Sequence, residues 1–289
     1  MKDIDFEKLR LKKLDQNELI TLVSWAAIEG WNPGPYDAEV FYMADPEGHY
    51  GYFIDEQMIA GGSIVSYNAQ FGFMGLFIVK PEYRSSGIGR KLWYQRRDML
   101  LSRLNEGASI GMDGVVAMQP FYSKGGFVSA FRDERHELIG SKQNVDRHIA
   151  LISKEDFPSI IEFDGHCFGF QRSAFLVPWL NIPGNANFKY ESDGNIHGFV
   201  VMRKAAIGYK IGPLFGNNEI VAQALYEACL NEVPGELVYL DISSANQQAV
   251  ELTKKFNTKF VFECARMYFG QPPSVPIHKV FGITTFELG

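Results

Sequence analysis

The sequence predicts a mixed α/β protein in which one arrangement of strands and helices occurs twice in tandem. Between residues 1 and 140, segments with strand and helix patterns follow one another in a recognisable order, and the same order begins again after residue 140. In the first half, an apolar strand runs into a glycine-containing helix start over residues 84–90. Because strands and helices bury their apolar faces against each other, each half is expected to form a sheet flanked by helices.

Local signals justify the elements of the first half in turn. Asp15 is a suitable helix N-cap and Gly30 a suitable helix end, so a helix is expected over 16–29. Residues 75–79 are apolar throughout, as in a strand buried on both faces, and Pro81 ends this strand because proline cannot donate a ladder hydrogen bond. The expected order is strand 6–14, helices 16–29 and 37–43, strands 50–54, 58–67 and 71–79, helix 88–105, strand 109–118, helix 119–124, and strands 128–132 and 135–139.

The segment Gly-Ser-Lys-Gln-Asn at 140–144 is the most linker-like part of the chain. We therefore expect two domains, 1–140 and 141–289, each within the usual domain size. The second is expected to contain strand 147–153, helices 156–168 and 173–180, strands 188–191, 198–203 and 206–214, helix 219–231, strand 236–242, helix 246–256, and strands 260–268 and 279–287.

A candidate phosphate site lies between strand 71–79 and helix 88–105. The connecting loop reads Arg84-Ser-Ser-Gly87-Ile-Gly89-Arg90. Its glycines allow a ligand to approach the backbone closely, and the first N–H groups of a helix are unpaired and lie at the positive end of the helix dipole. On glycine spacing alone, an ordinary strand-to-helix turn is the alternative. The spacing matches neither a P-loop nor a Rossmann loop.

The whole string resembles the acetyl-CoA loop of the GCN5-related N-acetyltransferases (GNAT), Gln/Arg-x-x-Gly-x-Gly/Ala, with Arg84, Gly87 and Gly89 in the pattern. The segment Phe-Tyr-Ser-Lys-Gly-Gly-Phe at 121–127 is similar to the family's Tyr-Glu-Lys-Leu-Gly-Phe segment, and 246–252 resembles its Asn-x-x-Ala segment. The resemblance implies two tandem acetyltransferase folds, each an α+β arrangement with a mixed, mostly antiparallel sheet.

The resemblance also implies acetyl-CoA as co-substrate, with no metal. In the family, a backbone N–H on the central strand meets the thioester carbonyl, and the pantetheine arm pairs with that strand like an added strand. Alignment back from Arg84 places these strand residues at 77–79, and the loop would hold the pyrophosphate. The implied cofactor-binding residues are Phe77, Ile78, Val79, Arg84, Ser85, Ser86, Gly87, Ile88, Gly89 and Arg90.

Catalytic residues follow from the same resemblance. Tyr122 is the candidate general acid for the leaving thiolate, the alternative being a ring that packs beneath the cofactor. Asp113 is a tentative base, the alternative being a hydrogen-bonding aspartate beside a glycine turn. Three aromatic residues are expected either to line the acceptor pocket or to fill the core, namely Trp31, Tyr36 and Phe41.

The second half departs from the family pattern. Its central strand runs into Ile-Gly-Pro-Leu-Phe-Gly-Asn-Asn at 211–218, where Pro213 removes an N–H donor, and Thr253 stands in the position that matches Tyr122. This half is therefore expected to lack the family's cofactor site, although a site through Gly212 and Gly216 is an alternative. Two roles are open for it: closing the acceptor site of the first half, or supplying the surface of a homodimer.

Composition narrows the partners. The net charge of −6, from 28 basic and 34 acidic residues, disfavours a nucleic-acid partner and is compatible with a cationic acceptor. The cysteines Cys167, Cys229 and Cys264 are far apart and predict buried free thiols in a reducing compartment, although a catalytic thiol at Cys167 is an alternative. Residues 1–8 lack the apolar core of a signal peptide, and no apolar run has the ~20 residues of a membrane helix, so a cytoplasmic protein with no membrane partner is expected.

The histidines and the loop at 168–172 are two smaller features of the sequence. The six histidines show no metal-ligand spacing. The loop at 168–172, Phe-Gly-Phe-Gln-Arg, is expected to be a turn between helices or a segment that reaches across to the first half.

The expected activity is acetyl transfer from acetyl-CoA to a primary amine, made directly within a ternary complex. The acceptor would be a small molecule or a peptide, which the sequence does not name. The alternatives are a non-catalytic acyl-CoA-binding or regulatory module, and an enzyme that uses another acyl group.

Overall fold

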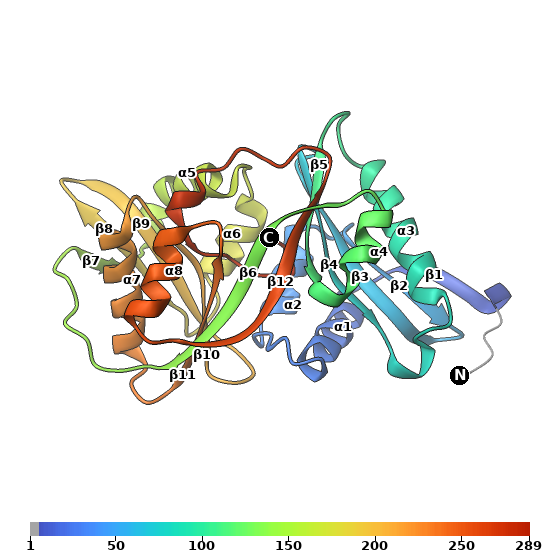
Figure 1. Cartoon of the computed structure of the whole chain (residues 1–289), viewed down its shortest axis with the longest axis horizontal. Coiled ribbons are helices and arrows are strands. Elements are labelled where there is room, and N and C mark those ends of the chain that lie inside the picture. Colours follow the sequence, from blue (N-terminus) through green and yellow to red (C-terminus); the bar gives the residue numbers. More distant parts are fainter. Residues whose placement is uncertain (1–5) are drawn as a thin grey trace.

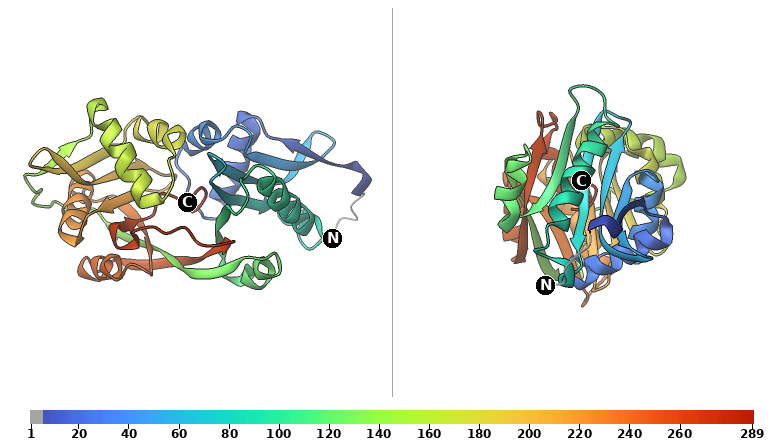
Figure 2. Two further views of the ribbon diagram at one scale, coloured as in Figure 1. Left: turned by 90° about the horizontal axis from the view of Figure 1, so that it is seen from above. Right: turned by 90° about the vertical axis from the view of Figure 1, so that its right-hand side faces the viewer.

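The two predicted copies of the fold share one continuous β-sheet. A computed structural model describes residues 6–289, so residues 1–5 of the N-terminal stretch considered above lie outside it. The two halves lie side by side along the longest axis, and the chain's last residue lies between them (Figures 1 and 2). The strands follow one another across the sheet in the order β1-β2-β3-β4-β5-β12-β6-β11-β10-β9-β8-β7, with β13 also paired to β10.

Apart from residues 128–139, the elements agree in kind and order with the expected ones. The strands are β1 (Leu9–Lys13), β2 (His49–Ile54), β3 (Gln57–Tyr67), β4 (Phe71–Val79), β5 (Ser109–Val115), β6 (Val128–Ile139), β7 (Ile149–Leu151), β8 (Ala186–Ser192), β9 (Asn195–Lys204), β10 (Tyr209–Gly216), β11 (Leu237–Ser243), β12 (Lys259–Phe269) and β13 (Val280–Gly282). The α-helices are α1 (Gln16–Ile28), α2 (Asp37–Ala44), α3 (Ile88–Leu101), α4 (Gln119–Lys124), α5 (Phe157–Phe168), α6 (Ser173–Leu180), α7 (Glu219–Glu232) and α8 (Gln247–Lys255). Short 3-10 turns occur at Phe6–Lys8, Pro81–Tyr83, Val116–Met118, Lys154–Asp156 and Ile277–Lys279.

Helix α1 shows how local sequence sets an element. Asp15 accepts a hydrogen bond from the backbone N–H of Glu18 at 2.9 Å, and the Glu18 carboxylate accepts one from the backbone N–H of Asp15 at 2.9 Å. This reciprocal capping box satisfies two N–H groups that the helix cannot pair itself. The predicted N-cap is therefore confirmed.

The last strands of the two halves are exchanged. Strand β6 lies between β12 and β11, and β12 lies between β5 and β6 (Figure 1). The prediction of separate strands at 128–132 and 135–139 is wrong, because Val128–Ile139 is one strand that passes from the first half into the second. The final strand is shorter than the predicted 279–287 and covers only Val280–Gly282.

Helices cover both faces of the sheet. On one face, α1, α2, α5 and α6 contribute to a single apolar core that spans the two halves, and the rings of Phe41 and Trp179 stack there with centroids 6.3 Å apart. On the other face, α3 and α4 cover the first half, and α7 and α8 cover the second (Figure 1). Within residues 6–289, no helix combines the length and apolar character needed to cross a bilayer.

Buried ion pairs join the halves. Asp37 of α2 pairs with Arg203 of β9 at 2.9 Å, and Arg135 of β6 pairs with Asp241 of β11 at 2.7 Å. Because a buried charge without its partner is costly, these pairs favour one relative arrangement of the halves.

The three cysteines are free and buried, as predicted, and burial raises the pKa of the Cys167 thiol to about 12. A thiol with this pKa is not a nucleophile near neutral pH.

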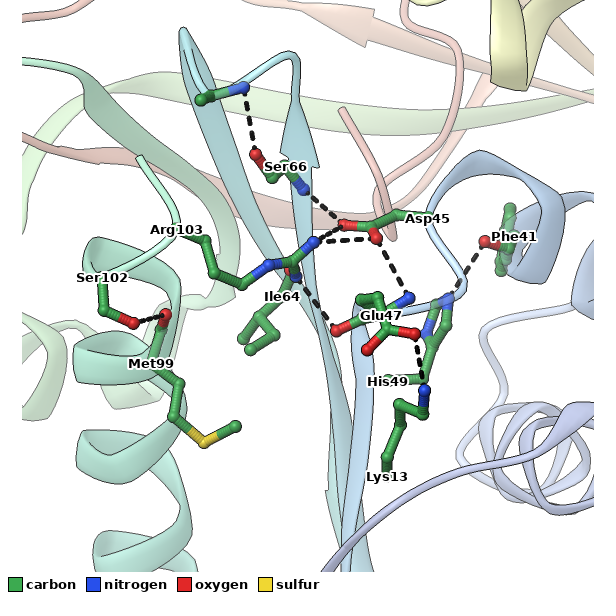
Figure 3. Close-up of polar contacts among 11 residues, drawn as sticks. Lys13, Phe41, Asp45, Glu47, His49, Ile64, Ser66, Met99, Ser102 and Arg103 are labelled. Atoms are coloured by element: carbon green, nitrogen blue, oxygen red, sulfur yellow. Dashed lines mark hydrogen bonds and ion pairs between the residues drawn. The ribbon is translucent and has the colours of Figure 1, made fainter. Parts of the chain in front are cut away.

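A polar cluster around Asp45 holds α3 against the sheet (Figure 3). Both carboxylate oxygens of Asp45 accept hydrogen bonds from Arg103, at 2.7 and 2.8 Å, and one also accepts from the backbone N–H of Ser66 at 2.8 Å. Arg103 also donates to the carbonyl oxygen of Ile64 at 2.9 Å. The cluster therefore ties the ends of α2 and α3 to β3.

Replacing Asp45 with alanine should lower the free energy of unfolding by about 3 kcal/mol, because Arg103 would lose the partner of a mostly buried ion pair. Urea unfolding followed by circular dichroism measures the change. Glu47→Ala is the matched control: it removes the neighbouring, exposed pair with Lys13 and should cost at most about 1 kcal/mol. Equal losses in the two variants would contradict this account.

His49 should make the fold sensitive to acid. The imidazole is fully buried beside the carbonyl oxygen of Phe41 at 3.0 Å, and burial lowers its pKa to about 4. In the unfolded chain a histidine pKa is about 6.5, so the unfolded state takes up the proton first and the free energy of unfolding falls as pH drops from about 6.5 to 4.

Between pH 7.5 and pH 5, protonation of His49 in the unfolded chain should lower the free energy of unfolding by about 2 kcal/mol. Urea unfolding of the wild type and of His49→Gln at both pH values measures it, and the variant should lose about that much less. The same loss in both proteins would refute the assignment to His49.

Candidate functional site

A cavity opens where β4 and β5 separate. The two parallel strands pair only from Phe71–Phe73 to Ser109–Gly111 and then diverge. The space between them is a cavity of about 370 Å³. Its walls come from both halves of the chain, and the residues that line it are Glu29, Gly30, Trp31, Met74, Gly75, Leu76, Phe77, Met112, Asp113, Val115, Tyr122, Phe262, Glu263, Cys264, Phe286 and Glu287.

Strand β4 has a bulge at this cavity. Leu76 and Phe77 lie opposite the single residue Gly62 of β3, since Gly75 pairs with Ser63 and Ile78 with Gly61. Leu76 has a φ of +49°, which is uncommon for a residue other than glycine. A bulge beside a cavity redirects backbone groups toward a ligand.

Arg96 of α3 fixes the orientation of this bulge. Its buried guanidinium donates to the carbonyl oxygens of Ser63 and Gly75, the latter at 2.9 Å. It occupies the space beside Gly62, where a Cβ would lie 2.2 Å from the guanidinium carbon. The Gly75 carbonyl therefore points toward β3. Because the N–H and C=O of a trans peptide point in opposite directions, the N–H of Leu76 points toward the cavity.

The three strand residues that were predicted to contact the cofactor lie in different surroundings. Of Phe77, Ile78 and Val79, only Phe77 lines the cavity. Ile78 is buried in the apolar core, and Val79 lies against Gly89. Leu76 was not predicted. The signal that could have found it is Gly75, since a glycine inside a strand often marks a bulge.

The loop at 84–90 fits a phosphate group. Gly87 is the N-cap of α3 with a φ of +89°, and Ser85 has a φ of +60°. A Cβ on Gly89 would lie 3.1 Å from the Cγ2 of Val79, so glycine lets the start of the helix pack closely on β4. The first N–H groups of α3 lack partners within the helix and lie at its positive end, as an anion site requires.

The side chains of this loop have structural roles. Arg84 donates through Nε to the Val79 carbonyl oxygen at 2.9 Å and forms an ion pair with Glu29. The Ser86 hydroxyl donates to the Tyr83 carbonyl oxygen at 2.6 Å, and Ile88 is fully buried. The guanidinium of Arg90 lies 5.8 Å from the centre of the Tyr94 ring. The loop would therefore meet a phosphate mainly through its backbone.

Tyr122 of α4 lies at the cavity and is almost fully buried. Its ring stacks on Trp93 with centroids 5.9 Å apart, and its edge lies where a Cβ on Gly114 would come within 2.5 Å. Burial raises the pKa of the phenol to about 12, so Tyr122 carries its proton at neutral pH. Tyr122 therefore has both the packing contact of one sequence-based alternative and the cavity position that the other, a general acid, requires.

Asp113 lies at the cavity wall with both oxygens occupied. Arg266 of β12 donates to them at 2.6 and 2.7 Å, and the Asp113 side chain is fully buried. Burial raises the pKa of this carboxyl, but Arg266 engages both of its oxygens. The geometry therefore favours the hydrogen-bonding alternative over the role of base.

The three aromatic acceptor candidates lie in different places. Trp31 lines the cavity. Tyr36 lies in a separate hollow beside α6, and Phe41 is fully buried against Trp179. The expectation that Phe41 contacts an acceptor needs correction, because α2 turns that side chain into the core. Tyr36 also does not reach the cavity, because it precedes α2 on the outer surface.

The second half supplies cavity residues that sequence reasoning missed. Because β12 pairs with β5, Phe262, Glu263 and Cys264 reach the cavity from β12. Phe286 and Glu287 reach it from segment 283–289, which follows β13. No local signal in the sequence reveals this, since it depends on which strands pair.

The loop at 168–172 also reaches the first half. The rings of Phe170 and Phe71 stack with centroids 4.8 Å apart, and Phe168 meets the Tyr67 ring edge-on at 5.0 Å. Of the two alternatives for this loop, the structure shows the one that crosses between the halves.

The corresponding opening in the second half is filled. Strands β10 and β11 pair only from Tyr209–Ile211 to Val238–Leu240, as β4 and β5 do. Here β13 pairs with β10 beyond that point, and the N–H of Ile283 donates to the Asp241 carbonyl oxygen of β11 at 2.8 Å. The chain's own backbone therefore occupies the space that remains open between β4 and β5.

No group of three or more histidine, cysteine or acidic side chains in residues 6–289 is arranged to hold a metal ion. The cavity combines the inward-pointing N–H of Leu76 with the protonated phenol of Tyr122, and the loop at 84–90 offers an anion site beside them. This set suits chemistry in which negative charge develops on an oxygen and a leaving group takes a proton.

Comparisons with known proteins identify relatives of both halves. Residues 16–127 match the model of the Acetyltransferase (GNAT) family, and residues 160–282 match the model of an Acetyltransferase (GNAT) domain. Holothin acyltransferase of Pseudoalteromonas sp. (strain SANK 73390) is 31% identical over 269 residues, covering 92% of this chain and 89% of that protein. The uncharacterized N-acetyltransferase YitH of Bacillus subtilis (strain 168) is 22% identical over 224 residues, covering 74% and 76%.

Solved structures show the same fold. A putative acetyltransferase from Pyrococcus horikoshii superposes with a TM-score of 0.83 at 22% identity, covering 100% of this chain and 99% of that one. A tandem GNAT protein from the clavulanic acid biosynthesis pathway gives a TM-score of 0.62 at 13% identity, covering 92% and 99%. These structures and the two family matches confirm the expected tandem of acetyltransferase folds.

Proposed function

Because the chain belongs to the GNAT acetyltransferase family and carries two GNAT domains in tandem, we propose that its first half transfers an acetyl group from acetyl-CoA to a primary amine. The observation that carries this proposal is the cavity between β4 and β5, with the loop at 84–90 beside it and Tyr122 in its wall. The proposed acceptor is a small molecule or a peptide amine that binds in this cavity, whose wall includes Trp31.

In this proposal the pyrophosphate of the cofactor lies on the N-terminus of α3, and its pantetheine arm lies along β4 as an added strand. The second half supports, by analogy, the placement of the pantetheine arm along β4. There β13 lies in the equivalent opening and pairs with β10, so this type of opening accepts an extended chain.

The chemistry then follows from the groups in the cavity. The amine nitrogen attacks the thioester carbonyl carbon, and the negative charge that develops on the carbonyl oxygen is stabilised by the N–H of Leu76. The C–S bond breaks as the tetrahedral intermediate collapses, and the departing thiolate takes the phenolic proton of Tyr122. Tyr122 regains a proton from solvent.

A direct transfer agrees with the thiol in the cavity. Cys264 is the cysteine that lines it, and burial raises the pKa of its thiol well above the ordinary value, with nearby Asp113 adding to the shift. Such a thiol remains protonated and is a poor nucleophile, so an acetyl-cysteine intermediate is disfavoured. We therefore propose a ternary complex of acetyl-CoA, amine and enzyme.

The acyl group is a separate question. The relative with 31% identity is named an acyltransferase, which does not specify acetyl. Competition among acetyl-, propionyl- and succinyl-CoA in a thiol-release assay measures the preference. Absence of thiol release with every amine would instead favour a non-catalytic acyl-CoA-binding module.

Replacing Gly87 with glutamate should lower CoA affinity at least about 100-fold, because it places a carboxylate at the proposed pyrophosphate position and a side chain at a positive φ. Isothermal titration calorimetry with CoA measures the affinity. Gly107→Glu is a matched control: Gly107 has a similar φ of +81° and open space around it, and lies in the turn that follows α3. Unchanged CoA affinity in Gly87→Glu would move the cofactor site away from this loop.

Tyr122→Phe should lower kcat about 100-fold and leave CoA affinity within about threefold, because the ring still packs on Trp93 while the proton donor is lost. Thiol release and calorimetry give the two quantities. Tyr94→Phe is the control, since Tyr94 also contacts Trp93, at 5.1 Å between centroids, from outside the cavity. An unchanged kcat in Tyr122→Phe would rule out the role of general acid.

A further inference from the structure

We propose that Glu287, brought in by segment 283–289 of the second half, binds the ammonium group of the acceptor and takes its proton. The inference deepens the proposed function and rests on it. It supplies the base that acetyl transfer to an amine requires, after Asp113 was found committed to Arg266.

Segment 283–289 is held on both sides of Glu287. Before it, the Thr284 hydroxyl accepts a hydrogen bond from Arg172 at 2.7 Å. After it, the Leu288 carbonyl oxygen accepts from the Tyr67 hydroxyl at 2.7 Å, and the Gly289 carbonyl oxygen accepts from Arg172 at 2.9 Å. Arg172 is itself fixed by a buried ion pair with Asp164 at 2.8 Å. Glu287 is therefore placed by rigid neighbours, as a catalytic group needs to be.

The segment lies directly on the bulge of β4. A Cβ on Gly75 would lie only 1.8 Å from the carbonyl oxygen of Glu287, so this close approach requires glycine. Gly75 precedes Leu76, whose N–H is proposed to meet the reacting carbonyl. Glu287 therefore belongs to the part of the cavity where the amine must attack.

Its carboxylate differs from the other acids of the cavity. Glu29 forms an ion pair with Arg84, and Asp113 forms one with Arg266. Glu263 lies 4.0 Å from Arg132, and 38% of its side chain is exposed. Within residues 6–289, Glu287 is the cavity acid that has no ion pair; its Oε2 accepts a hydrogen bond from the Thr285 hydroxyl.

Glu287 is also almost fully buried, with 4% of its surface exposed. Among residues 6–289, no lysine or arginine side chain lines the cavity, whose remaining wall is largely aromatic and aliphatic. Two buried cations, Lys210 of β10 and Arg135 of β6, interact with this carboxylate electrostatically, but neither forms an ion pair with it; an incoming ammonium group would supply that direct partner. The site therefore favours a cationic amine carried by an apolar group.

The proton and electron pairs balance in this scheme. The ammonium N–H bond breaks and its proton goes to the Glu287 carboxylate, which leaves the nitrogen lone pair free for attack on the thioester carbonyl. After the C–S bond breaks, Tyr122 gives its proton to the thiolate. The carboxyl proton of Glu287 and the second amine proton leave to solvent, and solvent reprotonates Tyr122.

The test compares Glu287→Gln with the wild type in a thiol-release assay, using the primary amine that the wild type acetylates fastest in a panel of arylalkyl- and alkylamines. Glutamine keeps the shape and an acceptor for the Thr285 hydroxyl but cannot take a proton. At pH 7, kcat/KM for the amine should fall about 100- to 1,000-fold, with the calorimetric CoA affinity within threefold.

The pH profile gives a readout that a purely structural role would not move. In Glu287→Gln the deficit should narrow as pH rises toward the pKa of the amine, since more amine is then already deprotonated. Glu287→Asp should recover part of the activity. Glu251→Gln, at an exposed acid of α8 outside the cavity, is the control, and its kcat/KM should remain within about threefold of the wild type.

A kcat/KM and a pH profile like those of the wild type in Glu287→Gln would overturn the inference, and so would an equal loss in Glu251→Gln. Should Glu287→Gln melt at a lower temperature than the wild type, Glu287→Asp decides: an activity no higher than that of Glu287→Gln across the pH range also overturns the inference. Thiol release by the wild type separates this result from failure of the proposed function, which would show no release with any amine.

Discussion

Strand β12 pairs with β5 along one side and with β6 along the other, and most of the structure depends on this antiparallel pairing. It joins the two halves through backbone hydrogen bonds, which side-chain substitutions do not remove. It also places Arg266 beside Asp113 and carries Phe262, Glu263 and Cys264 to the cavity. The proposed active site is therefore composite: the cofactor loop belongs to the first half, and much of the acceptor wall belongs to the second.

The two halves show two outcomes of one architecture. In each, a pair of parallel strands separates beyond three paired residues. In the first half the opening remains a cavity, whereas in the second half β13 fills it and satisfies the exposed backbone groups of β10. An unpaired strand edge in the interior is costly unless something pairs with it. The second half meets this need with its own chain, and segment 283–289 then continues toward the cavity of the first.

Sequence reasoning succeeded where the determining interactions are local. The bounds of Phe71–Val79 and Ser173–Leu180 were predicted as observed, because each is a short apolar run between polar segments. The placement of Tyr122 on a short helix and of Gly87 at the start of α3 followed from motifs of a few residues. The exchange of β6 and β12 could not be predicted, because strand patterning specifies which face is buried and says nothing about which strand lies alongside. Leu76 and Glu287 were missed for related reasons: one depends on a bulge held by Arg96, the other on a segment that meets β4 from more than 200 residues away in the sequence.

The exchanged strands also constrain how the chain folds as it is synthesised. The free side of β5 receives its partner only when β12 is made, up to residue 269, and β6 has neither neighbour until β11 follows it. The first half therefore leaves the ribosome with an open, hydrogen-bond-ready sheet edge that must wait for more than a hundred further residues. The first half therefore cannot complete its sheet until β12 of the second half has been made. The price of an active site built from both halves is a late, concerted closure in which the halves complete each other.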